Sequence, residues 1–191
     1  MGWIILIIVV VLIIAVISIY NSLVQAKMKV DNSWSQIDVQ LQRRFDLIPN
    51  FVETVKGYMQ HESETFEKIA ELRTSWANTK SVAEKADIDN QLSTALKTIM
   101  AVSENYPELK ANQNFSELSE ELRNTENKIS FSRQFYNDTV TMYNTKIQVF
   151  PSNIIANMFN FQPRELFKTE SDDARKNVKV DFNKWDSRDR S

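Results

Sequence analysis

The side chains that most often perform catalysis or bind metals are scarce in this chain of 191 residues. His61 is the only histidine, and the sequence HESET that begins there lacks the second histidine of a HExxH zinc-protease motif. One histidine is also too few for the two Glu-x-x-His pairs of a di-iron helical bundle. There is no cysteine, which excludes thiolate nucleophiles and zinc–thiolate sites. We expect His61 to be a surface residue.

Glycine-dependent and carboxylate-dependent chemistry is also poorly supported. Gly2 and Gly57 are the only glycines, so neither a P-loop nor a dinucleotide-binding fingerprint can be written. The 25 acidic residues always allow two carboxylates to meet, but nothing marks one pair above the rest. The 23 basic residues are interspersed with them and form no basic patch. We therefore expect no enzyme activity, no cofactor, no bound metal and no nucleic-acid partner.

One group of polar residues interrupts an apolar heptad pattern and is the best candidate for a functional cluster. Glu126 and Arg133 lie beside polar heptad positions in the second half of the chain. A buried charge must be paired, so we expect both to meet polar side chains from the first half. The candidates there are Arg43, Arg44, Asp46 and Asn50. Such a layer either fixes the register of packed helices or binds a ligand or partner.

The elements that must position these residues are long helices. Turn formation depends on glycine and proline, and the chain has only two glycines and four prolines, too few for a sheet protein. Apolar residues recur at spacings of three and four, and the last long stretch has nearly heptad spacing, which is typical of coiled-coil packing. We therefore predict an all-α protein with an antiparallel bundle of about four long helices.

Several helix boundaries follow from local signals. Asp46 is a good N-cap just before Pro49, which predicts a helix that restarts or kinks there. A polar connection is expected near Lys80 and Ser81, and a cap of the last long helix at Asn114 or Ser116. A short amphipathic helix is predicted over residues 153–159.

The N-terminus is predicted to be a membrane anchor. Residues 3–20, WIILIIVVVLIIAVISIY, carry no charge and span about 27 Å as a helix, close to the roughly 30 Å of a bilayer core. No basic residue precedes this run, which argues against a cleaved signal peptide. Lys27, Lys29, Arg43 and Arg44 follow it, so the positive-inside rule puts the C-terminal part in the cytoplasm.

The sequence thus divides into an anchor (1–24), a helical bundle (25–161) and a tail (162–191) that lacks periodicity. We expect the tail to be extended or disordered, with aromatic residues Phe167, Phe182 and Trp185 that can dock on the bundle or on a partner. Just after the anchor lies an apolar seam that a short bundle would leave partly uncovered, and we expect it to form an interface. Its members are Met28, Trp34, Ile37 and Leu41.

Three stretches resemble the LemA family: QIDVQLQRRFDLIPNFVETVKGY at 36–58, YPELKANQNFSELSEELRNTENKIS at 106–130 and RQFYNDTVTMYNTKIQVFPSNIIANMFNF at 133–161. With the preceding apolar segment and KVDF at 179–182, the resemblance covers nearly the whole chain. It implies a single membrane helix in the bacterial inner membrane, a short N-terminus outside and a cytoplasmic helical bundle. It does not imply an activity.

Two functional hypotheses remain. In the first, the bundle is a non-enzymatic scaffold or adaptor that is anchored in the lipid bilayer and binds a second copy of itself or other membrane proteins. In the second, it is a sensor whose polar layer around Glu126 and Arg133 binds a small molecule. The absence of any chemical motif favours the scaffold.

Overall fold

The protein is an all-α molecule, as the sequence predicted. The structure, a computed structural model, describes residues 2–59 and 62–168, and within them every regular element is a helix. His61 lies outside the described residues. The helices are α1 (Gly2–Lys56), α2 (Ser63–Asn78), α3 (Val82–Ser103), α4 (Pro107–Lys110), α5 (Gln113–Gln148) and α6 (Ser152–Met158).

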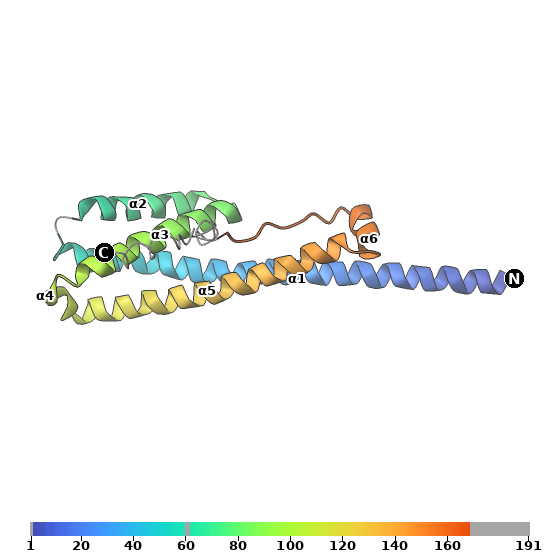
Figure 1. Cartoon of the computed structure of the whole chain (residues 1–191), viewed down its shortest axis with the longest axis horizontal. Helices are drawn as coiled ribbons and strands as arrows, with labels where there is room; N and C mark the ends of the chain where they lie inside the picture. Colours follow the sequence, from blue (N-terminus) through green and yellow to red (C-terminus); the bar gives the residue numbers. More distant parts are fainter. Residues whose placement is uncertain (1, 60–61, 169–191) are drawn as a thin grey trace, which may run out of the picture.

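Two long helices set the shape of the molecule (Figure 1). The 55 residues of α1 form a rod about 80 Å long, and α5 runs antiparallel beside its C-terminal part. The α2–α3 hairpin packs at the end of this pair that is far from the N-terminus, whereas α6 lies beside α1 at the other end of α5. The first part of α1 projects alone beyond the bundle.

The projecting part of α1 is the predicted anchor. It is the one candidate membrane-crossing helix among the described residues, by length and hydropathy, and no residue of its most apolar 18-residue segment is buried inside the protein. The bundle begins near Leu23, whose side chain is completely buried.

Pro49 lies inside α1, so of the two predicted alternatives, a restart or a kink, the restart at Asp46 is wrong. A proline in a helix interior costs about 3 kcal/mol because it removes a backbone hydrogen bond. Tertiary packing offsets that cost here, since Phe45, Ile48 and Phe51 around the proline are all buried. The helix ends only at Lys56, directly before Gly57.

The bundle core consists of the predicted apolar stripes, and the caps of α3 and α5 lie at or close to the predicted helix starts. Ring stacking joins Phe45 to Trp76 and Phe51 to Phe115, with centroid distances of 4.5 and 5.9 Å. Ser81 caps α3 by accepting a hydrogen bond from the Glu84 amide, which confirms the connection expected there. The cap of α5 is instead Asn112, just before the two predicted candidates, and it accepts from the Phe115 amide at 3.2 Å.

The apolar seam predicted after the anchor is largely covered, which corrects that expectation. Ile37 and Leu41 are completely buried, and Trp34 is half-buried against the rings of Tyr136 and Phe167. Among the four seam residues, only Met28 stays exposed. The physical reason is that α5, at 36 residues, is long enough to run along this whole part of α1.

Residues 162–168, which we call the strap, leave α6 without regular structure and lie along the bundle. Phe167 is only 1% exposed, so this first part of the predicted tail contributes to the core. The remaining tail residues, including Phe182, Trp185 and the KVDF sequence, lie outside the described residues.

Candidate functional site

A buried charge cluster joins three helices. It consists of Arg44 on α1, Asp89 on α3, and Glu126 and Arg133 on α5. One guanidinium nitrogen of Arg44, Nη1, lies 2.7 Å from Asp89 Oδ1 and 2.8 Å from Glu126 Oε2. Arg133 forms an ion pair with the other oxygen of Asp89. Since Arg44 and Asp89 are almost completely buried, the cluster ties α1, α3 and α5 together inside the bundle.

The cluster is electrically balanced, with two positive and two negative side chains. Burial lowers the pKa of Arg44, and the nearby Glu126 carboxylate partly raises it again. Burial, and after it the positive charge of Arg44, lowers the pKa of Arg133 to about 10. Arg133 therefore stays charged at neutral pH, and the guanidinium groups of Arg44 and Arg133 each face a carboxylate.

The structure brings together three of the six polar residues singled out in the sequence, namely Arg44, Glu126 and Arg133. Arg43 instead forms a surface ion pair with Glu121. Asp46 accepts a hydrogen bond from Gln42 on its own helix, and both Asp46 and Asn50 are exposed.

The sequence analysis missed Asp89, which is the central acid of the cluster. A signal was present, because Asp89 lies between Ile88 and Leu92 on the apolar stripe of α3, where a solvated aspartate is not expected. The Ser93 hydroxyl, one turn further along α3, donates to the Glu126 carboxylate at 3.4 Å.

A second polar arrangement on α5 holds the strap by its backbone. The side chain of Asn144 donates to the Arg164 carbonyl at 2.8 Å and accepts from the Arg164 amide at 2.9 Å. Asn137 makes the same two bonds to Phe167, at 3.0 and 2.8 Å. Each asparagine thus pairs with one strap residue as a neighbouring β-strand would.

The tyrosine directly before each asparagine donates a third hydrogen bond to the strap backbone. Tyr143 Oη donates to the Gln162 carbonyl and Tyr136 Oη to the Glu165 carbonyl, both at 2.9 Å. The two Tyr-Asn pairs are seven residues apart, about 10.5 Å along a helix, which matches three residues of extended strap at about 10 Å. We call these two Tyr-Asn pairs the clamps. The repeated Tyr-Asn dipeptide is visible in the sequence, but its partner segment is not.

On the other side of the α1–α5 pair the surface is open. Trp34 of α1 faces the strap. Gln36 is two residues further along, about 200° around the helix, so its side chain lies on the opposite side of α1. Gln36 lines two adjoining hollows of about 530 and 500 Å³ between α1 and α5, which we call the open groove.

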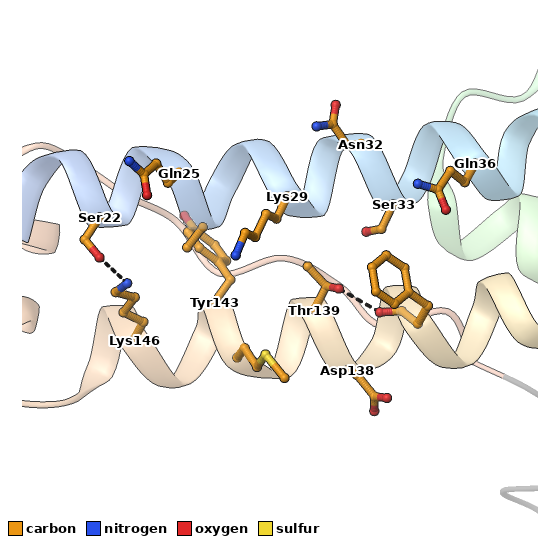
Figure 2. Close-up of a pocket in the computed structure, with 13 residues that line it drawn as sticks. Ser22, Gln25, Lys29, Asn32, Ser33, Gln36, Asp138, Thr139, Tyr143 and Lys146 are labelled. Atoms are coloured by element: carbon orange, nitrogen blue, oxygen red, sulfur yellow. Dashed lines mark hydrogen bonds between the residues drawn. The ribbon is translucent and has the colours of Figure 1, made fainter.

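One wall of the open groove is formed by α1 and the other by α5. Figure 2 shows Gln25, Lys29, Asn32 and Gln36 along the α1 wall, facing or flanking Thr139, Tyr143 and Lys146 of α5. Large apolar side chains at the groove are exposed to solvent. They are Val39 (63% exposed), Phe131 (76%), Phe135 (53%) and Met142 (72%).

Over the described ranges, 2–59 and 62–168, no three histidine, cysteine, aspartate or glutamate side chains are grouped so as to hold a metal ion. The described helices define an all-α class of protein. It is a long antiparallel helical bundle whose first helix continues into a segment able to cross a membrane.

Comparison with known proteins specifies the family. The sequence model of the LemA family matches residues 33–182. The chain is also similar to the curated Protein LemA of Metamycoplasma hominis, with 26% identity over 159 residues, 80% of this chain and 73% of that protein. The chain belongs to the LemA family, and the matched residues contain the charge cluster, both clamps and most of the open groove.

Proposed function

We propose that this protein is a membrane-anchored scaffold without enzymatic activity, which associates with a second copy of itself through the open groove. The anchor lies in the bacterial inner membrane with the short N-terminus outside, and the bundle lies in the cytoplasm. Lys27 and Lys29, just after the apolar segment, support this orientation, since basic residues stay on the cytoplasmic side.

The exposed apolar side chains of the open groove carry the proposal. Val39, Phe131, Phe135 and Met142 are each more than half exposed, although the same two helices bury comparable residues on their other side. A contiguous apolar surface of this kind on a folded domain marks an interaction site. The hollows between α1 and α5 give such side chains from another molecule a place to pack.

Membrane anchoring favours a second copy as the occupant. Because α1 is continuous with the anchor, the groove runs along the direction in which the chain leaves the membrane. A two-fold axis parallel to α1 keeps both anchors pointing into the same bilayer and places α5 of each copy over α1 of the other. Phe135 then reaches the α1 wall at the height of Ser33 and Gln36, which line the same hollow.

The size of the groove predicts a modest affinity between two bundles, and confinement to one membrane promotes their association. From Ser22 to Gln40 the groove extends about 27 Å, which gives an interface at the lower end of the range for specific complexes. Two anchors confined to one bilayer raise the effective concentration of the bundles. Association is therefore expected in membranes even where an isolated bundle would dissociate.

The alternative function, a ligand-binding sensor, has one observation in its favour. The Nε atoms of Arg44 and Arg133 are buried and lack a hydrogen-bond acceptor among the described residues. The four charges of the cluster, however, already pair with one another, and a small-molecule site needs polar groups that are free to turn to the ligand. The cluster is better suited to fixing the register of α1, α3 and α5.

Single-cysteine cross-linking in native membranes tests the scaffold proposal, because the natural chain has no cysteine. We expect the full-length Phe135→Cys variant to form a covalent dimer with a short bis-maleimide. The control is Glu71→Cys, an exposed position on α2 far from the groove, which should stay monomeric. Equal cross-linking of both variants, or none at Phe135→Cys, would contradict an interface at the groove.

A further inference from the structure

The corner between α5 and α6 exposes an unusual amount of apolar surface. We call residues 149–159 the foot. Its exposed apolar side chains are Val149 (47% exposed), Phe150 (79%), Ile154 (52%), Met158 (69%) and Phe159 (50%). The other side of α6 holds the foot in place, because Ile155 and Ala156 are buried against the bundle. The apolar surface is thus presented by a fixed element.

The sequence around the foot is free of charge. From Ile147 to Pro163 there is no Asp, Glu, Lys, Arg or His, although a quarter of the whole chain is charged. Lys146 and Arg164 flank this uncharged stretch. Apolar surface bordered by basic side chains is the composition of protein segments that lie at a membrane interface.

The foot lies level with the end of the predicted anchor. The Lys146 side chain donates to Ser22 Oγ, which aligns the end of α5 with the start of the bundle part of α1. Since α5 runs antiparallel to α1 and ends at Gln148, the foot that follows it begins on the side of Lys146 that is nearer to the membrane. The Phe159 ring lies 4.7 Å from the ring of Tyr20, the last aromatic residue of the apolar run.

We propose that the foot inserts into the interfacial layer of the same bilayer that holds the anchor, so that the protein contacts lipid at two places. This inference rests on the proposed membrane anchoring. The partner is a lipid surface, because the foot reaches the depth of Tyr20, where a membrane-spanning α1 meets the headgroups. Phe150, Ile154 and Met158 enter the acyl boundary and Lys146 stays among the headgroups, while Arg164 pairs with Asp31 of α1 further from the bilayer.

Two contacts with the bilayer restrict how the bundle can move. A single helix leaves the bundle free to tilt and rotate about the anchor. A foot on the α5 side fixes the rotation of the α1–α5 pair and holds it upright, with the open groove perpendicular to the membrane. Lipid contact at the foot therefore limits the orientations in which two anchored copies can meet.

Depth-dependent quenching tests the foot in the full-length protein. Ile154→Cys and Met158→Cys are labelled with an environment-sensitive fluorophore and reconstituted into phosphatidylethanolamine–phosphatidylglycerol vesicles. We expect a blue-shifted emission that loses most of its intensity when the lipids carry bromine on the acyl chains near the headgroup. Glu71→Cys is the control, because it is exposed on α2, at the end of the bundle far from the N-terminus and outside the open groove, and it should keep its intensity.

Val10→Cys, in the middle of the apolar run, separates the two claims. If the Val10 label is quenched by deeply brominated lipids and neither foot label is quenched, the proposed lipid contact of the foot is wrong, whereas the proposed membrane anchor is supported. If no label is quenched, the anchoring itself fails and the foot fails with it. A foot label that is blue-shifted but insensitive to bromine is covered by protein, which would also overturn lipid contact.

Discussion

The two sides of the α1–α5 pair solve the problem of burial in different ways. On the covered side, facing α3 and the strap, polar groups of α5 find partners within the chain: Arg133 meets Asp89, and Asn137 meets the Phe167 backbone. On the open side, Phe135 and Met142 remain exposed between hollows. On the covered side the polar groups are paired within one copy of the chain. The exposed apolar side chains of the open side become buried only when another molecule packs on them.

This difference shows where stability and association reside. Substitutions on the covered side should lower the free energy of unfolding, because they leave buried groups without partners. Substitutions on the open side should leave the fold unchanged and act on association. The expected change in the free energy of unfolding is therefore largest in the charge cluster, smaller at the clamps and smallest on the open side.

The largest effect is expected for Asp89→Ala. The substitution leaves Arg44 and Arg133 buried without their shared carboxylate, which should lower the free energy of unfolding by about 3–5 kcal/mol. Chemical denaturation of the full-length protein in detergent, followed by circular dichroism, measures this. The control Glu121→Ala removes the surface partner of Arg43 and should cost less than about 1 kcal/mol. Equal losses in the two variants would show that the cluster holds nothing together.

A smaller effect is expected for Asn137→Ala, which removes both hydrogen bonds to the buried Phe167 backbone. An unpaired buried backbone group costs about 1–3 kcal/mol, so the strap should open more often. Hydrogen exchange at the Phe167 amide should accelerate about tenfold, the equivalent of roughly 1.4 kcal/mol. Asn127→Ala, an exposed asparagine on the same helix, should leave that rate unchanged. If both variants exchange alike, the clamps do not secure the strap.

The clamps also predict a loss of stability in alkali. Burial raises the pKa of both Tyr136 and Tyr143 above the ordinary value of 10.0. The folded protein therefore holds these protons more tightly than the unfolded chain, so the contribution is complete below pH 10 and is lost as pH rises through the folded pKa. In Tyr136→Phe/Tyr143→Phe the unfolding free energy should fall less steeply above pH 10 than in the natural protein. Arg133, whose pKa is lowered on folding, contributes a rise in stability over the same pH range. Because Arg133 is present in both proteins, its contribution cancels when one profile is subtracted from the other. Parallel profiles would contradict the role of the two hydroxyls.

The smallest change in stability is expected on the open side. Met142→Asp places a charge where the side chain is 72% exposed, so the free energy of unfolding should change by less than about 0.5 kcal/mol. The same substitution puts a carboxylate into the proposed interface and should reduce covalent dimer formation by the Phe135→Cys protein. A large loss of stability would show instead that Met142 belongs to the core of a single copy.

The helices could be predicted from sequence more fully than the site. Apolar spacing and the scarcity of Gly and Pro were enough for the all-α fold and the α5 stripe, because burial of one helix face leaves a periodic signal. The uncharged N-terminal run was enough for the helix that is able to cross a membrane. The continuation of α1 through Pro49 was not predictable locally, since it depends on packing around Phe45 and Phe51.

The candidate site was predictable only where charges interrupted a stripe. Glu126, Arg133 and Asp89 each interrupt an apolar stripe in this way, but the pairing of Asp89 with Arg44 depends on packing of α3 against α1 that no local pattern specifies. The apolar seam failed for the same reason. Ile37 and Leu41 look available in the sequence, but the long-range packing of α5 buries them and leaves the opposite side of α1 open.

The measurement that tests the scaffold proposal most directly is the mass and composition of the complex extracted from native membranes. The full-length tagged protein and its Met142→Asp variant are cross-linked in native membranes with an amine-reactive reagent, so that a modest association survives extraction in mild detergent. Every protein that accompanies them is then identified. We predict a defined homo-oligomer for the natural protein, with or without a stoichiometric membrane partner, and a monomer for the variant. A natural protein that is a bare monomer would contradict the scaffold function.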